Sequence, residues 1–163
     1  MRYFYDCEFI EDGRTIDLIS IGVAAEDGRE FYAVSTDFDP GRAIDWVRRN
    51  VLDKLPGPAD RAWRSRERIR EDLFAFLTEP GEPIELWAWI AGYDHVVLAQ
   101  LWGDMRALPR EIPRFTHELR QRWEDLGCPP QPEQPRDQHD ALADARHNLA
   151  RWRALPAWPG SGG

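Results

Sequence analysis

The chain begins with the sequence RYFYDCEF at residues 2–9, and this stretch decides the fold. Such alternation is typical of a β-strand, which presents successive side chains to opposite faces. The two faces receive Tyr3, Tyr5 and Cys7 on one side and Phe4, Asp6 and Glu8 on the other. A solvated face is the ordinary explanation of an isolated Asp-x-Glu pair. Here Asp6 and Glu8 share their face with Phe4, and charged side chains are seldom buried unless they are paired or bind a metal.

The rest of the chain predicts one α/β domain over residues 1–155. A hairpin turn at Asp27-Gly28 joins predicted strands at 16–25 and 30–35, which gives three antiparallel strands at the start. The apolar stretch 84–90 predicts a central strand buried on both faces. Cap residues and apolar spacing predict helices at about 39–51, 65–77, 94–102, 115–126 and 138–152. We therefore expect a mixed sheet flanked by helices, followed by a disordered tail at 156–163.

Composition limits the classes of function. The formal net charge of -8 disfavours a protein that binds long nucleic acids with high affinity. It is a weaker argument against a hydrolase that binds only a short 3′ end. Only two cysteines are present, Cys7 and Cys128, and they form no CxxC motif, which argues against a zinc module and suits a reducing cytoplasm. No apolar run approaches the length of a membrane span.

A third acidic position follows the predicted central strand. Asp94 comes directly after Tyr93, near the start of the next helix. Aspartate is a preferred N-cap, so capping is the ordinary explanation of Asp94. Contact with a metal through a bridging water is compatible with that role.

The last helical segment carries His139 and Asp144, with Asp137 as its predicted N-cap. Residues five apart on a helix differ in direction by about 140°, so their spacing alone does not bring them together. His139 has to reach in from the N-terminal turn while Asp144 faces the sheet. Asp140 is a rival ligand because it lies four residues before Asp144, and a surface histidine at a helix end is the plain alternative for His139. Alanines at 141, 143 and 145 permit close approach to the sheet.

In order and spacing, these residues resemble the DEDDh exonucleases, which are ribonuclease-H-like 3′-to-5′ exonucleases. That family has Asp-x-Glu on its first strand, an aromatic-Asp pair in mid-chain and His-x4-Asp on a late helix. The match covers about residues 2–150, and the stretches 2–6, 87–89, 93–95 and 139–142 further resemble the compact actinobacterial-type exoribonucleases sometimes called ribonuclease AS. Two departures are Cys7 in place of the usual Thr and the loss of the Asn before Tyr93-Asp94.

The resemblance implies a two-metal phosphodiester hydrolase. By similarity, Asp6, Glu8 and Asp144 hold one Mg²⁺ or Mn²⁺ ion, and Asp6 and Asp94 hold a second, with Asp94 acting directly or through water. His139 is the implied general base. The implied activity is removal of nucleoside 5′-monophosphates from RNA 3′ ends, with 3′ overhangs or adenine-rich RNA as candidate substrates. A homodimer acting in the cytoplasm is also implied.

Candidate base-stacking residues are Phe9, Trp63 and Tyr93, since aromatic rings stack on nucleic-acid bases. Three alternatives remain open from the residues alone. A DNA 3′-5′ exonuclease would share every catalytic residue. An inactive ribonuclease-H-like interaction domain would have no need to keep all five catalytic residues, which are Asp6, Glu8, Asp94, His139 and Asp144. An aspartyl-phosphate phosphohydrolase is disfavoured, because Asp6-Cys7-Glu8 lacks a second Asp.

Overall fold

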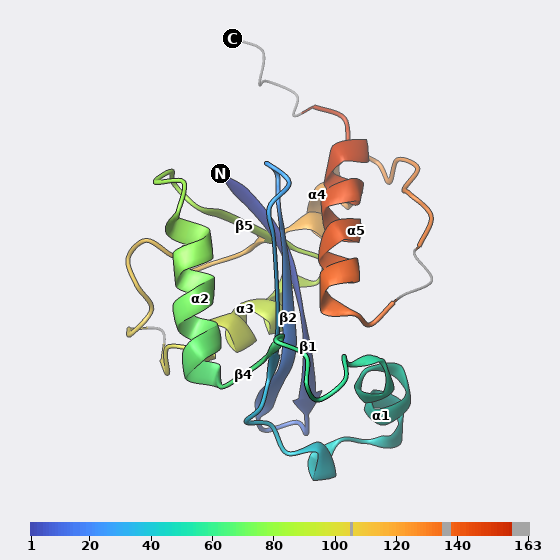
Figure 1. Ribbon diagram of the computed structural model, residues 1–163. Helices are drawn as coiled ribbons and strands as arrows, with labels where there is room; N and C mark the ends of the chain where they lie inside the picture. The colour runs from blue at the N-terminus through green and yellow to red at the C-terminus, as the bar shows by residue number, and fades with distance from the viewer. Residues whose placement is uncertain (105, 135–137, 158–163) are drawn as a thin grey trace.

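The computed structural model describes residues 1–104, 106–134 and 138–157 and has one mixed sheet with helices on both faces (Figure 1). The strands lie in the order β4-β3-β2-β1-β5-β6. Their bounds are β1 Arg2–Glu11, β2 Ile16–Ala25, β3 Glu30–Ser35, β4 Trp63–Arg64, β5 Glu85–Ala88 and β6 His117–Glu118. The predicted class, an α/β domain with a mixed sheet, is confirmed.

Strand directions place the ends of three strands at one edge of the sheet. Strands β1, β2 and β3 are antiparallel neighbours, as predicted. Strand β1 also pairs in parallel with β5 through residues 2–4, and β5 pairs in parallel with β6. The carboxyl ends of β1, β5 and β6 therefore point the same way, which is the usual location of binding sites in open α/β sheets.

The helices differ from the predicted ones mainly at their boundaries. Their bounds are η1 Pro40–Arg42, α1 Asp45–Asn50, η2 Leu52–Lys54, α2 Arg66–Thr78, α3 Ala91–Gln100, α4 Leu119–Asp125 and α5 Ala141–Ala154. The helix expected from residue 39 is thus broken into three short pieces. Within the helix expected over 115–126, residues 117–118 form β6 instead, and α4 begins only at Leu119. Residue Asp137, the predicted N-cap of the last helix, and the tail from residue 158 lie outside the described residues.

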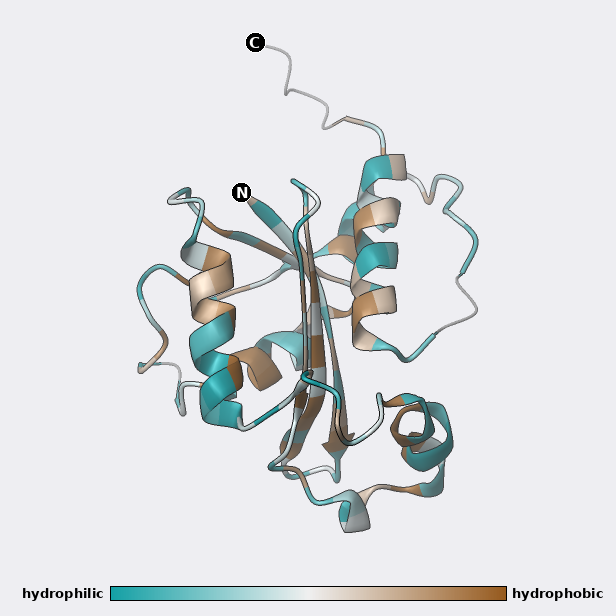
Figure 2. Ribbon diagram, viewed as in Figure 1, coloured by the Kyte–Doolittle hydropathy of each residue, from teal (hydrophilic) through white to brown (hydrophobic). Residues whose placement is uncertain are grey.

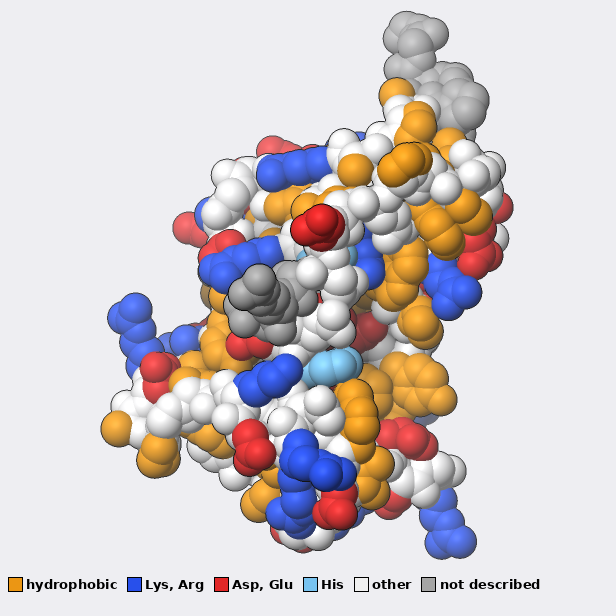
Figure 3. Space-filling model, turned by 90° about the vertical axis from the view of Figure 1, so that its right-hand side faces the viewer, with side chains coloured by type: hydrophobic (Ala, Val, Ile, Leu, Met, Phe, Trp, Pro, Cys, Tyr) orange, Lys and Arg blue, Asp and Glu red, His pale blue; other side chains and the backbone are white. Residues whose placement is uncertain are grey.

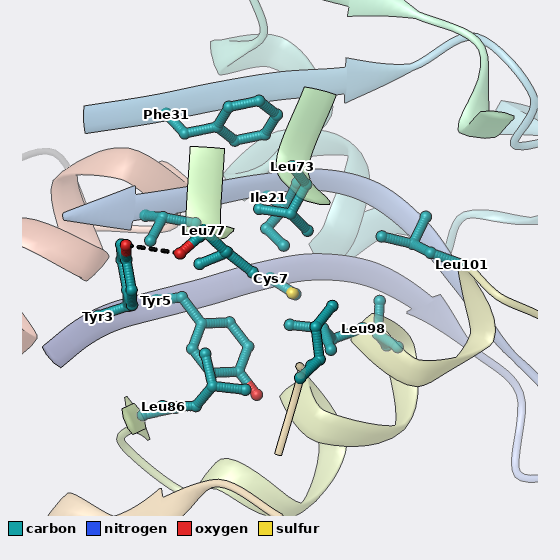
Figure 4. Packing of buried hydrophobic residues seen from close by; sticks show 14 of the residues in the cluster. Tyr3, Tyr5, Cys7, Ile21, Phe31, Leu73, Leu77, Leu86, Leu98 and Leu101 are labelled. Carbon is teal, nitrogen blue, oxygen red and sulfur yellow. Dashed lines mark hydrogen bonds between the residues drawn. The ribbon is translucent and has the colours of Figure 1, made fainter. Parts of the chain in front are cut away.

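Apolar clusters cover both faces of the sheet. Tyr3, Tyr5 and Cys7 of β1 pack with Leu73 of α2 and Leu98 of α3, and the Tyr3 hydroxyl donates to the Leu77 carbonyl at 2.8 Å (Figure 4). On the opposite face, Phe4 and Trp87 pack with Ala145 and Leu149 of α5. Figure 2 shows α2 and α5 on opposite sides of the sheet with apolar residues among polar ones. The alternation predicted for residues 2–9 is therefore confirmed.

A third apolar cluster places α1 below α5. Ile10 and Ile19 of the sheet pack with Ala43, Val47 and Val51. Helix α1 therefore lies beside the end of β1 and on the same side of the sheet as α5 (Figure 1). Within the described part of the chain, no helix has the length and apolar character needed to cross a membrane.

Candidate active site

Asp6 and Glu8 lie near the carboxyl end of β1, beyond the last residue that pairs with β5. Both are partly buried and belong to the strand face covered by α5. Gly22 of β2 is the partner of Asp6 in the antiparallel ladder. A Cβ atom at Gly22 would lie 2.3 Å from backbone atoms of Ala141 and Leu142, so glycine at this position lets the start of α5 approach the sheet next to Asp6.

Asp94 reaches the same place from the other face of the sheet. Its Oδ1 accepts a hydrogen bond from the Cys7 backbone N–H at 2.8 Å, and its side chain is buried, with 5% exposure. Helix α3 begins at Ala91 after Ile90, so Asp94 is not an N-cap and capping, the ordinary explanation of this residue, does not apply. Asp94 is instead held in the first turn of α3, facing β1.

His139 and Asp144 are brought together because His139 precedes the helix. Its backbone has φ 64°, and its N–H donates to Asp144 Oδ2 at 2.7 Å. The N-cap of α5 is Asp140, whose Oδ1 accepts from the Ala143 N–H at 2.8 Å. Ligand atoms of Glu8, His139 and Asp144 all lie within 4.8 Å of one another. Because His139 is not part of the helix, the 140° difference in direction expected for two helical residues five apart does not apply.

The acidic groups lie in an environment that opposes their charge. Burial, followed by the Asp94, Glu8 and Asp144 carboxylates, raises the pKa of Asp6 well above its usual value. Burial and the neighbouring Asp144 and Asp94 raise the pKa of Glu8 to about 8. Burial likewise raises the pKa of Asp94 to about 7 and that of Asp144 to above its ordinary value. Without a cation, like charges here repel one another.

The donor set fits a hard divalent cation. Four carboxylates that share one cleft offer the oxygen ligands that Mg²⁺ and Mn²⁺ prefer. A divalent cation would also offset the repulsion that raises their pKa values. The four carboxylates therefore have the chemistry of a metal site, and Glu8 and Asp144, with His139, also have the proximity.

The five predicted catalytic residues line one cleft of about 650 Å³, together with Phe9 and Tyr93. The rings of Phe9 and Tyr93 stack with centroids 5.8 Å apart and planes 9° apart, and Tyr93 is 51% exposed. Figure 3 shows the side of the molecule that carries α5 and α1, where basic side chains lie beside a histidine. The cleft therefore combines acidic groups with an exposed aromatic surface.

Trp63 is the one predicted site residue that does not line this cleft. It lies in a separate, apolar pocket of about 480 Å³, where its ring stacks on Phe38. Its Nε1–H donates to the Pro56 carbonyl at 3.1 Å. The structure therefore does not bring Trp63 together with the acidic residues.

Several cleft residues were missed by the sequence analysis. Asn148 and Arg151 follow Asp144 at intervals of four and seven residues, so helical periodicity alone indicates that they share its face. Asn148 Nδ2 donates to the Tyr5 carbonyl at 3.2 Å, and the Arg151 guanidinium lies 4.1 Å from the centre of the Trp89 ring. No comparable sequence signal marks Trp46, whose ring meets that of His139 edge-on at 4.7 Å.

Comparison with solved structures supports the class of fold. The structure of S. pombe Pop2p in its Mg²⁺- and Mn²⁺-bound form, a ribonuclease-H-like protein, aligns with a TM-score of 0.50 and 14% sequence identity. The alignment covers 93% of this chain and 81% of the S. pombe chain. The fold is therefore ribonuclease-H-like.

Sequence comparison defines the family within that class. Residues 1–155 match the family described as the 3′-5′ exoribonuclease Rv2179c-like domain. Two relatives from Mycobacterium tuberculosis, 3′-5′ exoribonuclease Rv2179c of strain H37Rv and 3′-5′ exoribonuclease MT2234.1 of strain CDC 1551, are each 64% identical over 163 residues. Each match covers 99% of this chain and 97% of the relative. The chain belongs to the Rv2179c-like exoribonuclease family, and it is a 3′-5′ exoribonuclease.

Proposed function

We propose that the protein is a DEDDh-type exoribonuclease that uses two Mg²⁺ or Mn²⁺ ions to release nucleoside 5′-monophosphates from RNA 3′ ends. The proposal is carried by one observation, the convergence of Asp6, Glu8, Asp94, His139 and Asp144 on a single cleft. These residues come from β1, α3, the segment just before α5 and the first turn of α5, so local sequence does not account for their meeting.

The metal ligands in this proposal are the four carboxylates. Asp6, Glu8 and Asp144 would hold one ion, and Asp6 with Asp94 would hold the second. Bound cations supply positive charge for the oxygens of the transferred phosphoryl group and lower the pKa of coordinated water. The protein contributes the orientation of the ligands, because Asp94 is fixed by the Cys7 N–H and Asp144 accepts from the His139 N–H.

His139 is the proposed general base. Imidazole accepts protons near neutral pH, and a ring nitrogen of His139 lies within 4.8 Å of carboxylate oxygens of Glu8 and Asp144. Two contacts hold the residue in place without occupying its ring nitrogens. One is its own N–H bond to Asp144, and the other is the edge-on packing against Trp46. The ring is thus available to take a proton from the attacking water.

Phe9 and Tyr93 are the proposed stacking surface for the terminal base. Base-aromatic stacking tolerates any sequence and does not require a basic surface, which suits a chain with a net charge of -8. The preference for RNA over DNA rests on the family. Activity on 3′ overhangs or adenine-rich RNA, assembly into a homodimer and action in the cytoplasm are further parts of the proposal. Light scattering coupled to size-exclusion chromatography tests the dimer.

The test of function uses RNA with a 5′ label and a single-stranded 3′ overhang, beside DNA of the same sequence. Each is incubated with Mg²⁺, Mn²⁺ or a chelator. The released nucleotides are then identified as 5′-monophosphates or 3′-monophosphates by chromatography. The proposal predicts metal-dependent shortening from the 3′ end, release of 5′-monophosphates and faster loss of RNA. Equal activity in chelator contradicts the metal mechanism, and faster loss of DNA favours the DNA exonuclease alternative.

A further inference from the structure

The corner between β5 and α3 contains a strained residue at the edge of the cleft. Ile90 has φ 61° and ψ 52°, the left-handed conformation that β-branched residues rarely adopt. Its side chain is 50% exposed and lines the cleft. Strain of this kind persists only where surrounding structure enforces it. A specific contact must therefore hold the Ile90 turn.

The carboxylate of Glu118 provides that contact. Its Oε1 accepts from the Ile90 N–H at 2.9 Å, and its Oε2 accepts from the Ala91 N–H at 2.7 Å. Ile90 has no side-chain acceptor with which to cap α3, so Glu118 takes the place of a local N-cap. Glu118 is brought there by the sheet, because it is the parallel partner of Ala88 at the end of β5.

The Ile90 turn, which Glu118 holds, leads directly into the residues that face the cleft. Tyr93 and Asp94 lie in the first turn of α3, within four residues of Ile90. The neighbouring Thr116 adds a second tie, because its Oγ1 hydrogen-bonds His95 Nδ1 at 3.1 Å. Displacement of the Ile90 turn would therefore move the exposed wall formed by Ile90 and Tyr93.

We propose that Glu118 is a positioning residue for the exoribonuclease reaction, which holds the Ile90 turn so that Ile90 and Tyr93 present a fixed wall to the 3′-terminal nucleotide. The inference rests on the proposed role of this cleft. Removal of the carboxylate releases three backbone N–H groups, those of Ile90 and Ala91 and that of Arg120 at the start of α4, and it releases the strain at Ile90. Binding of the RNA end is then affected more than the turnover of bound RNA.

The test compares Glu118→Ala with Glu124→Ala, a matched change at an exposed position of α4 that pairs with Arg120. Kinetic constants for RNA hydrolysis are measured well below each melting temperature, and amide hydrogen exchange is followed at Ile90 and Ala91. We expect Glu118→Ala to raise KM by about 10- to 100-fold with a smaller effect on kcat. The Ile90 and Ala91 amides should exchange faster, and Glu124→Ala should match wild type.

Two further variants distinguish positioning from general stability. Glu118→Gln keeps only one side-chain acceptor and should fall between wild type and Glu118→Ala. Ile90→Asn in the Glu118→Ala background should reverse part of the increase in KM, because asparagine adopts the left-handed conformation at lower cost. Unchanged KM in a folded Glu118→Ala or Glu118→Gln protein overturns the inference. Inactivity of the wild type instead contradicts the proposed function.

Discussion

Replacement of Gly22 by alanine is predicted to misalign the active site without touching any catalytic side chain. The added Cβ would lie 2.3 Å from backbone atoms of Ala141 and Leu142, whereas ordinary contacts begin at 3.4 Å. Because these neighbours are backbone, β2 and the start of α5 must separate by about 1 Å. His139 and Asp144 move with α5. A misplacement of about 1 Å lowers kcat/KM by about 100-fold, and over-packing lowers the free energy of unfolding by about 1–3 kcal/mol.

The assay measures kcat/KM for the 5′-labelled RNA together with the thermal unfolding of each variant. Gly57→Ala is the matched control, because its added Cβ has no atom within 4 Å and the residue does not line the cleft. Activity is compared at a temperature where every variant is folded. Wild-type kcat/KM in a folded Gly22→Ala protein would refute the argument that close packing of α5 on β2 aligns the site.

Two further predictions concern charge and stacking. In chelator, the folded state holds the protons of Glu8 and Asp94 more tightly than the unfolded state does. Their contribution to the free energy of unfolding is therefore fully present below their ordinary pKa values, falls as pH rises above those values, and is lost once pH has passed about 7 to 8. Melting temperatures should therefore fall over this range more steeply for wild type than for Glu8→Gln, and Mn²⁺ should reduce the fall; equal slopes would contradict this. Tyr93→Ala should raise KM for RNA by about 5- to 100-fold through lost stacking, whereas Trp63→Ala should not change KM. A larger increase in KM for Trp63→Ala than for Tyr93→Ala would contradict the proposal that Phe9 and Tyr93 form the stacking surface.

The strands were predictable because their signal is local. Alternation over residues 2–9 assigns each β1 side chain to a face, and Asp27-Gly28 marks the hairpin. The helix expected over 115–126 was partly wrong because residues 117–118 pair with β5, and parallel pairing between distant segments leaves little trace in sequence. The cap alternative for Asp94 could not be excluded from the sequence for a related reason. The true start of α3 depends on Glu118, which is distant in the chain.

The candidate site was predictable as a set of residues but not as a geometry. Helical spacing places His139 and Asp144 on different faces, and only the positive φ of His139 brings its N–H to the Asp144 carboxylate. Asp140, the rival ligand, is used as the N-cap of α5. Gly22 gave no signal, since the close approach that requires glycine exists only after β2 and α5 pack together.

The most direct test of the account compares Asp144→Asn with Asp140→Asn on 5′-labelled RNA in Mn²⁺. Asparagine at 144 keeps an oxygen that can accept from the His139 N–H but loses the charge that a metal ligand needs. Asparagine at 140 keeps the helix cap and removes an equal charge. We expect a loss of about 100-fold or more in the 3′-shortening rate for Asp144→Asn and near wild-type rates for Asp140→Asn. Retained activity in Asp144→Asn, or equal loss in both variants, would contradict the assignment of Asp144 as a metal ligand.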